Sequence, residues 1–415
     1  MRIEKCQEFW RFFKKNTVSR FTEKTIFDKI IIIQLSKKGM ERMKKKMLII
    51  GITMAAAGSE KSFLSFARHA IDYHQYDVDL LLAKKTGDFL SQIPKEIRVL
   101  EMGKDGEIFL IHRDNAMGII ARRYLMKNPL RAFRLLPHMI RRKTAKTAAE
   151  KDFASNRMWC ELLKKMPAWD EEYDVALAYW GDHTMFYMCD KVKAKKKIAW
   201  LHFDYANPPR EDALYLHYFS KCDKVITVSK KIENSLKTAL PEIADKVMTM
   251  ENIIDAEEIL RLAKEPFDFE DDFDGVRLLT VGRICHQKGY DMAIPAIARL
   301  ISEKHDIKWY IIGDGEAADK ENLRALMQAY SLEQHISFLG IKQNPYPYMK
   351  ACNIYLQPSR HEGKPIAVEE AKILQKPIVV TNYSSAKEQL QSYPVYEIGE
   401  ISEKGIYEAL QKMLA

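Results

Sequence analysis

Short apolar runs alternate with segments of helical periodicity along most of this chain, and this alternation restricts the possible folds more than any other feature. Such runs, which lack the polar alternation of a half-exposed strand, are typical of strands buried on both faces. Strands that alternate with helices form parallel sheets with helices on both sides. The sequence therefore predicts an α/β protein, with strands expected at Leu48–Ile52, Val78–Leu82, Val175–Tyr179, Lys197–Leu201, Lys224–Val228, Val276–Val281, Ile307–Ile312, Ile336–Leu339, Ile354–Gln357 and Ile378–Val380.

The length and composition of the chain favour two domains. Its 415 residues exceed one typical domain, and a hydrophobic content of 47% is enough for two cores. The acidic segment 265–275, bounded by a proline and a glycine, is expected to link them. The predicted organisation is a basic extension at residues 1–46, domains at 47–264 and 276–415, and the linker at 265–275.

Several classes of protein are disfavoured by composition. No apolar run approaches the roughly 18 residues of a membrane span, and the longest near the start is only Ile30–Ile33. A secretory signal is not expected, because charges continue through the first segment and no small-residue cleavage pattern follows. Six scattered cysteines show no zinc-ligand spacing, which favours a reduced setting. These features predict a cytoplasmic protein.

The positive charge is concentrated near the start of the chain. Residues 1–46 hold 14 Lys and Arg against 5 Asp and Glu, an excess that equals the +9 of the whole chain. Aromatic residues among these lysines, including Phe9 and Trp10, could form a basic helix at a membrane surface. The alternative is an unstructured or wrongly included extension, with Met43 or Met47 as the true start.

A second basic stretch carries apolar residues at helical spacing. Residues 116–149 contain nine Lys and Arg and no acid, with residues such as Phe133, Leu136 and Ile140 interleaved. Such a helix could lie on an anionic leaflet, where each nearby cation adds on the order of 1 kcal/mol. An ordinary surface helix is the alternative. Nucleic acid is not expected as a partner, because no nucleic-acid-binding motif accompanies the charge.

A phosphate-binding turn is predicted after the strand at Val276–Val281. Gly282-Arg283 is followed, after four residues, by Lys288-Gly289. Arg283 would supply a fork of donors and Lys288 a point charge at a strand-to-helix turn, where an anion is favoured. A solvated surface pair is the alternative for these two cations.

A pair of carboxylates marks the other arm of the predicted site. Glu362 and Glu370 are separated by seven residues, and the segment between them runs from a loop into a helix that begins near Ile366. A carboxylate accepts two hydroxyl hydrogen bonds, as vicinal diols of a sugar offer. A solvated acidic helix face is the alternative, and Glu369 is a rival to Glu370 by composition.

The chain resembles family 4 glycosyltransferases of the GT-B fold. The resemblance rests on LLTVGRICHQKGYDMAI, YIIGDG, ISFLG and PSRHEGKPIAVEEAKILQKPIVVTN, and more loosely on MLIIGITMAAAGSEKSF and IAWLHFDY. It covers residue 47 to the end, and the last block is similar to bacterial capsule or exopolysaccharide transferases. It implies two Rossmann-like domains whose parallel sheets face a central cleft, the first for the acceptor and the second for the donor. GT-B chains usually end with a helix that crosses back to the first domain, whereas this sequence stops after Ile406–Leu414.

The resemblance also implies roles for particular residues in the C-terminal half. Arg283 and Lys288 would bind the donor diphosphate, Glu362 the donor sugar and Glu370 the ribose. Backbone amides of residues 363–366 would approach the sugar and phosphates; these residues are Gly363, Lys364, Pro365 and Ile366. Lys364-Pro365 stands where the family often has Phe-Gly, which leaves the donor sugar open.

Two segments of the N-terminal half extend the resemblance. Gly58, in the sequence GSEK, follows the first strand and is similar to the family's glycine-rich loop, where small residues let the backbone approach a ligand. His202, in WLHFDY, matches a histidine that faces the donor sugar. A plain strand-to-helix turn and a structural histidine are the respective alternatives.

Two further motifs suggest competing functions. Gly313 and Gly315 resemble part of a dinucleotide fingerprint, which would indicate an NAD-dependent oxidoreductase, although the family resemblance places this turn near the nucleotide base. Asp77-Val78-Asp79 resembles a metal-binding Asp-x-Asp motif, but it begins a strand and is interpreted as a solvated strand entry. No metal or other cofactor is therefore expected.

The sequence as a whole predicts a metal-independent glycosyltransferase, and the family resemblance implies that it retains the configuration of the transferred sugar. It would move a hexose or N-acetylhexosamine from a UDP- or GDP-linked donor to a glycan acceptor, either lipid-linked or a free oligosaccharide, in cell-surface polysaccharide synthesis. It would act at the cytoplasmic face of the membrane. A catalytically impaired homologue that serves as a binding subunit is the alternative.

Overall fold

The computed structural model describes residues 44–55, 57–110 and 130–415, with side chains from residue 133 onward in the last range, Ala148 excepted. Contacts divide these residues into two compact units. The N-terminal unit contains residues 44–55 and 71–251, and the C-terminal unit contains residues 57–70 and 252–415. The basic extension up to residue 43, and residues 116–129 of the second basic stretch, lie outside the described residues.

The N-terminal unit is built on a seven-stranded parallel sheet with the order β3-β2-β1-β4-β5-β6-β7. Residues Met47 to Ile50 of β1 are fully buried, because β1 pairs on both edges and is covered on both faces. The strands are β1 (Lys45–Gly51), β2 (Tyr76–Leu82), β3 (Ile97–Glu101), β4 (Glu172–Ala178), β5 (Lys193–Leu201), β6 (Lys224–Thr227) and β7 (Val247–Thr249).

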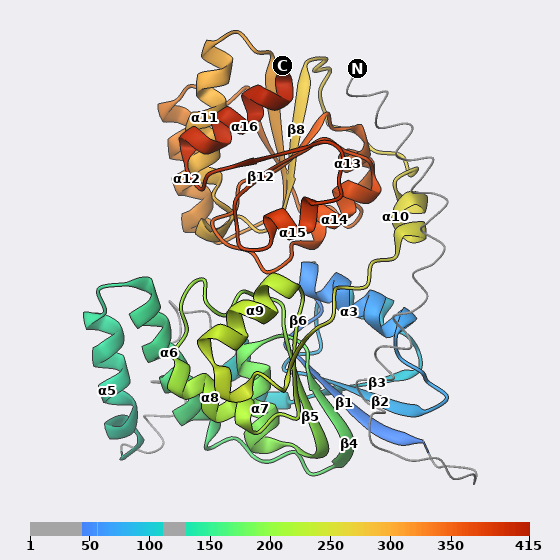
Figure 1. Ribbon diagram of the computed structural model, residues 1–415, viewed down its shortest axis with the longest axis vertical. Coiled ribbons are helices and arrows are strands. Elements are labelled where there is room, and N and C mark those ends of the chain that lie inside the picture. The colour runs from blue at the N-terminus through green and yellow to red at the C-terminus, as the bar shows by residue number, and fades with distance from the viewer. Residues whose placement is uncertain (1–43, 56, 111–129) are drawn as a thin grey trace. The chain divides into compact units, whose positions relative to one another are not determined.

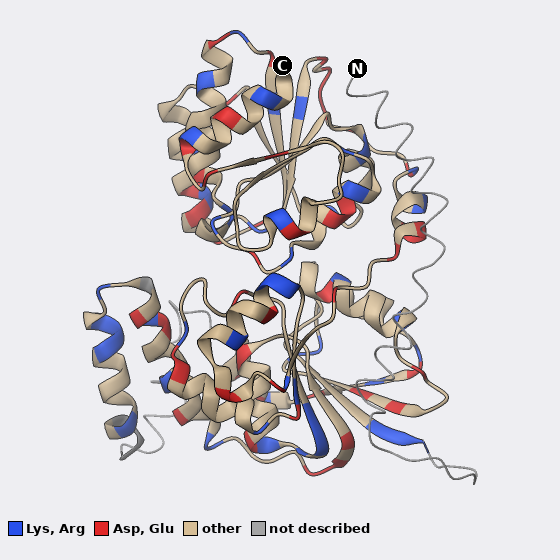
Figure 2. Cartoon of the chain, in the orientation of Figure 1, with Lys and Arg blue, Asp and Glu red and all other residues tan. Residues whose placement is uncertain are grey.

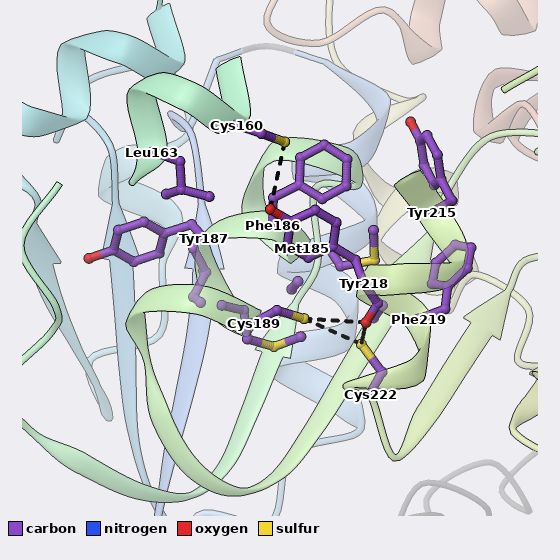
Figure 3. Packing of buried hydrophobic residues seen from close by; sticks show 14 of the residues in the cluster. Cys160, Leu163, Met185, Phe186, Tyr187, Cys189, Tyr215, Tyr218, Phe219 and Cys222 are labelled. Atoms are coloured by element: carbon purple, nitrogen blue, oxygen red, sulfur yellow. Dashed lines mark hydrogen bonds between the residues drawn. The ribbon is translucent and has the colours of Figure 1, made fainter. Parts of the chain in front are cut away.

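Helices α6, α7 and α8 enclose an aromatic core in this unit, seen in Figure 3. The Tyr218 ring lies 4.3 Å from that of Phe186, and the Tyr218 backbone oxygen accepts hydrogen bonds from the thiols of Cys189 and Cys222. The elements around the sheet (Figure 1) are η2 (Leu90–Gln92), η3 (Gly103–Leu110), α5 (Leu130–Thr144), α6 (Ala148–Leu163), α7 (Asp182–Lys191), α8 (Asp212–Ser220), α9 (Lys230–Ala239) and η5 (Pro241–Ile243).

The C-terminal unit is built on a six-stranded parallel sheet with the order β10-β9-β8-β11-β12-β13. The two central strands, β8 and β11, pair with each other. The strands are β8 (Val276–Val281), β9 (Ile307–Ile312), β10 (Ile336–Gly340), β11 (Ile354–Gln357), β12 (Ile378–Thr381) and β13 (Tyr396–Gly399).

Successive residues of these strands enter two separate cores, as the period of two requires. Leu278 packs in one core and Leu279 in the other. Helices α11, α12 and α16 complete the first core, and α13, α14 and α15 complete the second (Figure 1). The remaining elements of this unit are α3 (Gly58–His69), α10 (Ala256–Leu262), η6 (His286–Lys288), α11 (Tyr290–Ser302), α12 (Ala317–Ala329), α13 (Tyr346–Ala351), α14 (Ile366–Ile373), α15 (Ala386–Leu390) and α16 (Glu403–Leu414). Among the helices of the described ranges, none is long and apolar enough to cross a bilayer.

All ten expected strands are confirmed, with ends that differ by a few residues. Three strands were not predicted, namely β3, β7 and β13. Each lies at an edge of its sheet. These three edge strands are short or carry charged residues, so they lack the continuous apolar run by which the other strands, including the edge strand β10, were recognised.

The interpretation of Asp77-Val78-Asp79 as a solvated strand entry is wrong for Asp79. This carboxylate is only 7% exposed, because it lies inside β2 next to β3. It receives two hydrogen bonds from Arg98, of 2.7 and 2.6 Å, and one of 2.8 Å from the Tyr173 hydroxyl. Asp79 therefore ties β2 to the adjacent strand β3 through Arg98 and to β4 through Tyr173.

Candidate functional site

The predicted donor residues gather where β8 and β11 end. These strands are neighbours, and chain order proceeds outward from them in opposite directions across the sheet. Loops at such a switch point leave a crevice outside the carboxyl ends of the strands, where ligands bind in open α/β sheets. The loop 282–289 follows β8 and the loop 358–365 follows β11.

Gly289 lets the two loops approach each other closely. Its backbone is left-handed, with φ of 68°, and a Cβ there would lie 2.1 Å from the carbonyl oxygen of Pro358. Only glycine fits both conditions without strain. The position of Gly289 in the sequence motif is therefore explained by the packing of one loop on the other.

Polar contacts fasten the same two loops. The side-chain amide of Gln287 donates to the backbone oxygen of His361 at 2.9 Å, and the backbone amide of Arg360 donates to the backbone oxygen of Gln287 at 2.8 Å. The Arg360 guanidinium donates to both carboxylate oxygens of Asp291, at 2.7 Å each. These bonds hold the pKa of Asp291 below its usual value. The loops thus form one rigid edge.

Glu362 is buried and receives three donors on one oxygen. Its Oε1 accepts from Lys288 Nζ at 2.7 Å, from the Ser359 hydroxyl at 2.6 Å and from the Gln357 amide at 3.3 Å. Glu362 as a whole residue is 8% exposed to solvent. None of the hydrogen bonds from described residues goes to Oε2. One oxygen is therefore fixed by the protein, and the other is left to accept from a ligand.

The two predicted cations have different surroundings. The Lys288 side chain crosses Gly282, since its Cε lies 3.3 Å from where a Cβ of Gly282 would stand. Lys288 is thereby brought beside Arg283, which is exposed and forms no ion pair with any described residue. A guanidinium with unused donors next to an ammonium suits a diphosphate.

Glu370 is the second buried carboxylate, at 2% exposure in α14. Its Oε1 accepts from the Tyr346 hydroxyl at 2.9 Å and from Lys61 Nζ, on α3, at 3.1 Å. Burial, together with the negative charge of Glu370, raises the pKa of the Tyr346 phenol, so this hydroxyl stays protonated and donates. Its neighbour Glu369 pairs instead with Lys372 at 2.9 Å. The geometry thus distinguishes the two carboxylates, which composition alone did not.

Hydrogen bonds from Ser385 and Gln389, at α15, also hold the segment between the two carboxylates. The Ser385 hydroxyl donates to the Gly363 oxygen, and the Gln389 side chain donates to the Pro365 oxygen at 3.0 Å. Pro365 caps α14 without a side-chain hydrogen bond. The first amides of this helix are therefore available to an anion or a sugar oxygen.

Lys364, Ile366 and Gly58 lie in the same region. Lys364 Nζ is 4.0 Å from Glu369 Oε1, at the start of α14. Gly58 begins α3, and a Cβ there would lie 3.8 Å from the Cδ1 of Ile366. Helix α3 thus brings Gly58 and Lys61 to α14, although Lys61 and Glu370 are 309 positions apart along the chain.

Gly313 and Gly315 have a structural explanation. Gly313 has φ of 147°, and a Cβ there would lie 2.0 Å from the Gly282 oxygen. Gly315 forms an isolated parallel bridge with Ile284. Close approach of two neighbouring loops accounts for both residues, so their role toward a nucleotide base stays a prediction. Their turn follows β9, the second strand of its sheet in chain order, whereas a dinucleotide fingerprint follows the first.

His202 belongs to the other compact unit. It follows β5, where its ring stacks on Trp200 at 5.7 Å and lies 4.6 Å from that of Tyr179. The structure therefore brings together Gly58 and the predicted residues of the C-terminal half, and it places His202 at the carboxyl edge of the N-terminal sheet. Its role toward the donor sugar stays a prediction.

Four residues of the site were not identified from sequence. Ser359 and Gln357 support Glu362, and Lys61 and Tyr346 support Glu370. Gln357 gave a signal, because a polar residue at the end of a fully buried strand needs a partner. Tyr346 and Lys61 carried no such signal in the sequence, because their partner Glu370 lies far from both along the chain.

Comparison with known proteins finds sugar transferases that are similar to the C-terminal part of this chain. Residues 264–414 match the family described as "Glycosyl transferases group 1". A relative from Campylobacter jejuni, N-acetylgalactosamine-N,N'-diacetylbacillosaminyl-diphospho-undecaprenol 4-alpha-N-acetylgalactosaminyltransferase, is 31% identical over 172 residues. These residues are 41% of this chain and 45% of the relative, so the chain spans less than half the length of that protein. Membership of family 4 itself stays a prediction.

Solved structures confirm the predicted fold class, α/β with two parallel sheets of the GT-B type. Anabaena Alr3699/HepE in complex with UDP aligns with a TM-score of 0.57 at 14% identity, covering 89% of this chain and 90% of that one. WaaG, a glycosyltransferase involved in lipopolysaccharide biosynthesis, aligns with a TM-score of 0.53 at 15% identity, again covering 89% and 90%. At this identity the likeness concerns the fold alone.

Proposed function

We propose that this protein is a glycosyltransferase that transfers a sugar from a nucleotide diphosphate donor to a glycan acceptor in cell-surface polysaccharide synthesis. The observation that carries the proposal is the exposed, unpaired Arg283 beside the buried pair of Lys288 and Glu362. Cations for a diphosphate and a carboxylate for sugar hydroxyls stand together at the switch point of the sheet. The family match of residues 264–414 and the named relative support the same reaction class.

Each part of the donor has a counterpart in the site. Arg283 and Lys288 neutralise the diphosphate, and the free Oε2 of Glu362 accepts from sugar hydroxyls. Glu370 accepts from the ribose hydroxyls, exchanging its bond from Lys61 for bonds from the diol. The amides at the start of α14 bind the remaining phosphate or sugar oxygens.

The proposed chemistry retains the configuration of the transferred sugar. The bond between the anomeric carbon and the diphosphate oxygen breaks while the acceptor oxygen bonds to the same face of that carbon. The acceptor hydroxyl proton passes to the leaving diphosphate oxygen. Negative charge grows on the diphosphate during this step, and donors fixed beforehand stabilise it most effectively. Arg283 and Lys288 supply this stabilisation in the proposed route, which therefore uses no metal.

Helix α5 supports a membrane-surface location for a lipid-linked acceptor. Its apolar residues Phe133, Leu136 and Ile140 are 73%, 46% and 53% exposed, whereas Leu135 packs inward. Arg134 and other exposed basic residues of α5 flank this apolar face, and Figure 2 shows the basic residues along the helix. An apolar stripe with flanking cations suits the interface of an anionic leaflet.

Calorimetric titration of UDP, GDP and their sugar conjugates tests the donor assignment, followed by transfer assays with and without a chelator. We expect one nucleotide to bind and Arg283→Ala to weaken it by roughly tenfold or more. Transfer should survive the chelator. If no nucleotide sugar binds, the proposal fails. Tight nucleotide binding without transfer to any glycan would favour the binding subunit.

Vesicle co-sedimentation tests the surface of α5. The variant combines Arg134→Glu, Arg141→Glu and Phe133→Ser, and it spares Arg142, which bonds to Ser155 inside the unit. A matched control reverses two exposed lysines of α16, Lys404 and Lys412. We expect only the α5 variant to lose binding to anionic vesicles. Equal binding by both proteins would show that α5 is an ordinary surface helix.

A further inference from the structure

A cavity of about 230 Å³ lies inside the N-terminal unit, apart from the donor residues. Ile52, Trp180 and Phe203 line it, and they follow β1, β4 and β5 by one or two residues. Strands β1 and β4 are neighbours from which the chain order departs in opposite directions. The cavity therefore stands at the switch point of this sheet, where ligand sites form.

Aromatic rings provide flat walls in the cavity. Trp159 reaches it from α6, and its ring stacks on that of His183 with centroids 4.4 Å apart and planes 2° apart. The Arg210 guanidinium lies over the Phe203 ring at 4.5 Å. Each stacking contact fixes a side chain in the wall, so the cavity presents a preformed shape.

Two donors of the wall have no hydrogen-bond partner among the described residues. They are Nε1 of Trp159, a residue only 6% exposed, and Nε of Arg210. A buried donor without an acceptor costs about 1–3 kcal/mol. Such a cost is removed when a ligand supplies oxygen atoms at these two positions.

The charged side chains of the wall balance each other. Arg142 and Arg210 face the cavity together with Asp152 and Asp182, and Asn156 adds an amide. A phosphate or carboxylate would meet two carboxylates here, and an apolar ligand would leave Nε1 of Trp159 and Nε of Arg210 without an acceptor. Hydroxyl groups both donate and accept, so they match a wall in which donors and acceptors are mixed.

We infer that this cavity binds one uncharged pyranose ring of the glycan acceptor. The volume is below the roughly 300–1,000 Å³ of sites for drug-sized ligands, which fits one ring rather than a nucleotide. Trp159 and Arg210 donate to ring hydroxyls, and the carboxylates accept from them. The inference rests on the proposed transfer to a glycan acceptor and names the part of the acceptor that this unit holds.

Fluorine NMR on the full chain labelled with 5-fluorotryptophan tests the site without turnover. The probes are the methyl glycosides of glucose, galactose, N-acetylglucosamine, N-acetylgalactosamine and glucuronic acid, at millimolar concentration. We expect at least one neutral glycoside to shift the resonances of Trp159 and Trp180 and to leave Trp309, in β9 of the other unit, unchanged. Trp159→Phe keeps an aromatic ring but removes the donor, and should weaken binding roughly threefold to tenfold.

Matched variants separate local effects from misfolding. Arg210→Lys keeps the charge but removes Nε, and should also weaken glycoside binding. The fluorine resonance of Trp180 measures this binding. Trp169→Phe changes a tryptophan of the same unit outside the cavity wall, and should bind like the wild type. Thermal melting of each variant checks the fold.

The outcomes distinguish this inference from the proposed function. If UDP or GDP binds but no neutral glycoside shifts Trp159 and Trp180, the cavity is not a sugar site and the donor assignment stands. If glycosides bind and no nucleotide does, the cavity is a sugar site and the glycosyltransferase proposal fails. Binding of the glucuronoside alone, or unchanged affinity in both Trp159→Phe and Arg210→Lys, overturns the assignment of an uncharged ring to this wall.

Discussion

Breaking the Lys288–Glu362 pair should cost both stability and nucleotide affinity, and the two costs can be separated. The side chains are 14% and 9% exposed, and the two atoms are 2.7 Å apart. Removing one partner of a fully buried pair costs about 3–5 kcal/mol, whereas exposed pairs are worth under about 1 kcal/mol. Because Ser359 and Gln357 still donate to Glu362 when Lys288 is lost, we expect Lys288→Met to lower the free energy of unfolding by about 2–3 kcal/mol.

A double-mutant cycle measures the interaction itself. Glu362→Gln alone should also destabilise the protein, because it leaves the Lys288 ammonium mostly buried without its counter-charge. The double variant should cost less than the sum of the two single variants by about 1–2 kcal/mol. Urea titration followed on fluorine-labelled Trp309, the one tryptophan between residues 252 and 415, reports the C-terminal unit alone.

Arg283→Ala is the matched control for this cycle. Arg283 is exposed and forms no ion pair with the described residues, so its loss should weaken nucleotide binding and leave the free energy of unfolding within about 0.5 kcal/mol of the wild type. Strict additivity of the two single variants would refute the coupling. Equal destabilisation by Arg283→Ala and Lys288→Met would refute the distinction between a free and a paired cation.

Three further changes test other parts of the molecule. Glu370→Gln should weaken nucleotide binding by roughly tenfold, as measured by calorimetry, with an unchanged far-UV spectrum; wild-type affinity would remove Glu370 from the site. Gly289→Ala should lower the free energy of unfolding by more than about 2 kcal/mol, because it forces a left-handed backbone and a clash with Pro358; a smaller loss in urea titration would show that the loops move apart easily. Burial alone would raise the pKa of Glu233, but hydrogen bonds from Lys230, Lys237 and Thr249 outweigh it and hold the pKa at about 2. Glu233→Gln should therefore cost about 3 kcal/mol at pH 7, and this difference should shrink as the pH falls from about 4.5 toward 2, because a depressed carboxyl pKa stabilises the fold only above it; a difference that stays constant down to pH 3 contradicts the assignment.

Local features of the sequence determined much of the donor site. The apolar runs predicted the central strands. The glycine-bounded turn after β8 and the paired carboxylates after β11 predicted the two loops that meet at the carboxyl ends of these strands. These features are readable because strand burial and glycine spacing are properties of neighbouring residues. Parallel strands then bring their carboxyl ends to one edge without further information.

Tertiary structure alone decided which atoms act on each other. The pairing of Lys61 with Glu370 joins segments 309 residues apart, and the burial of Asp79 depends on the strand beside it and on Tyr173. The cavity beside Trp159 likewise combines α6 with the ends of three strands. The physical reason is that burial and hydrogen-bond satisfaction depend on everything packed around a group, whereas periodicity describes only its neighbours in the chain.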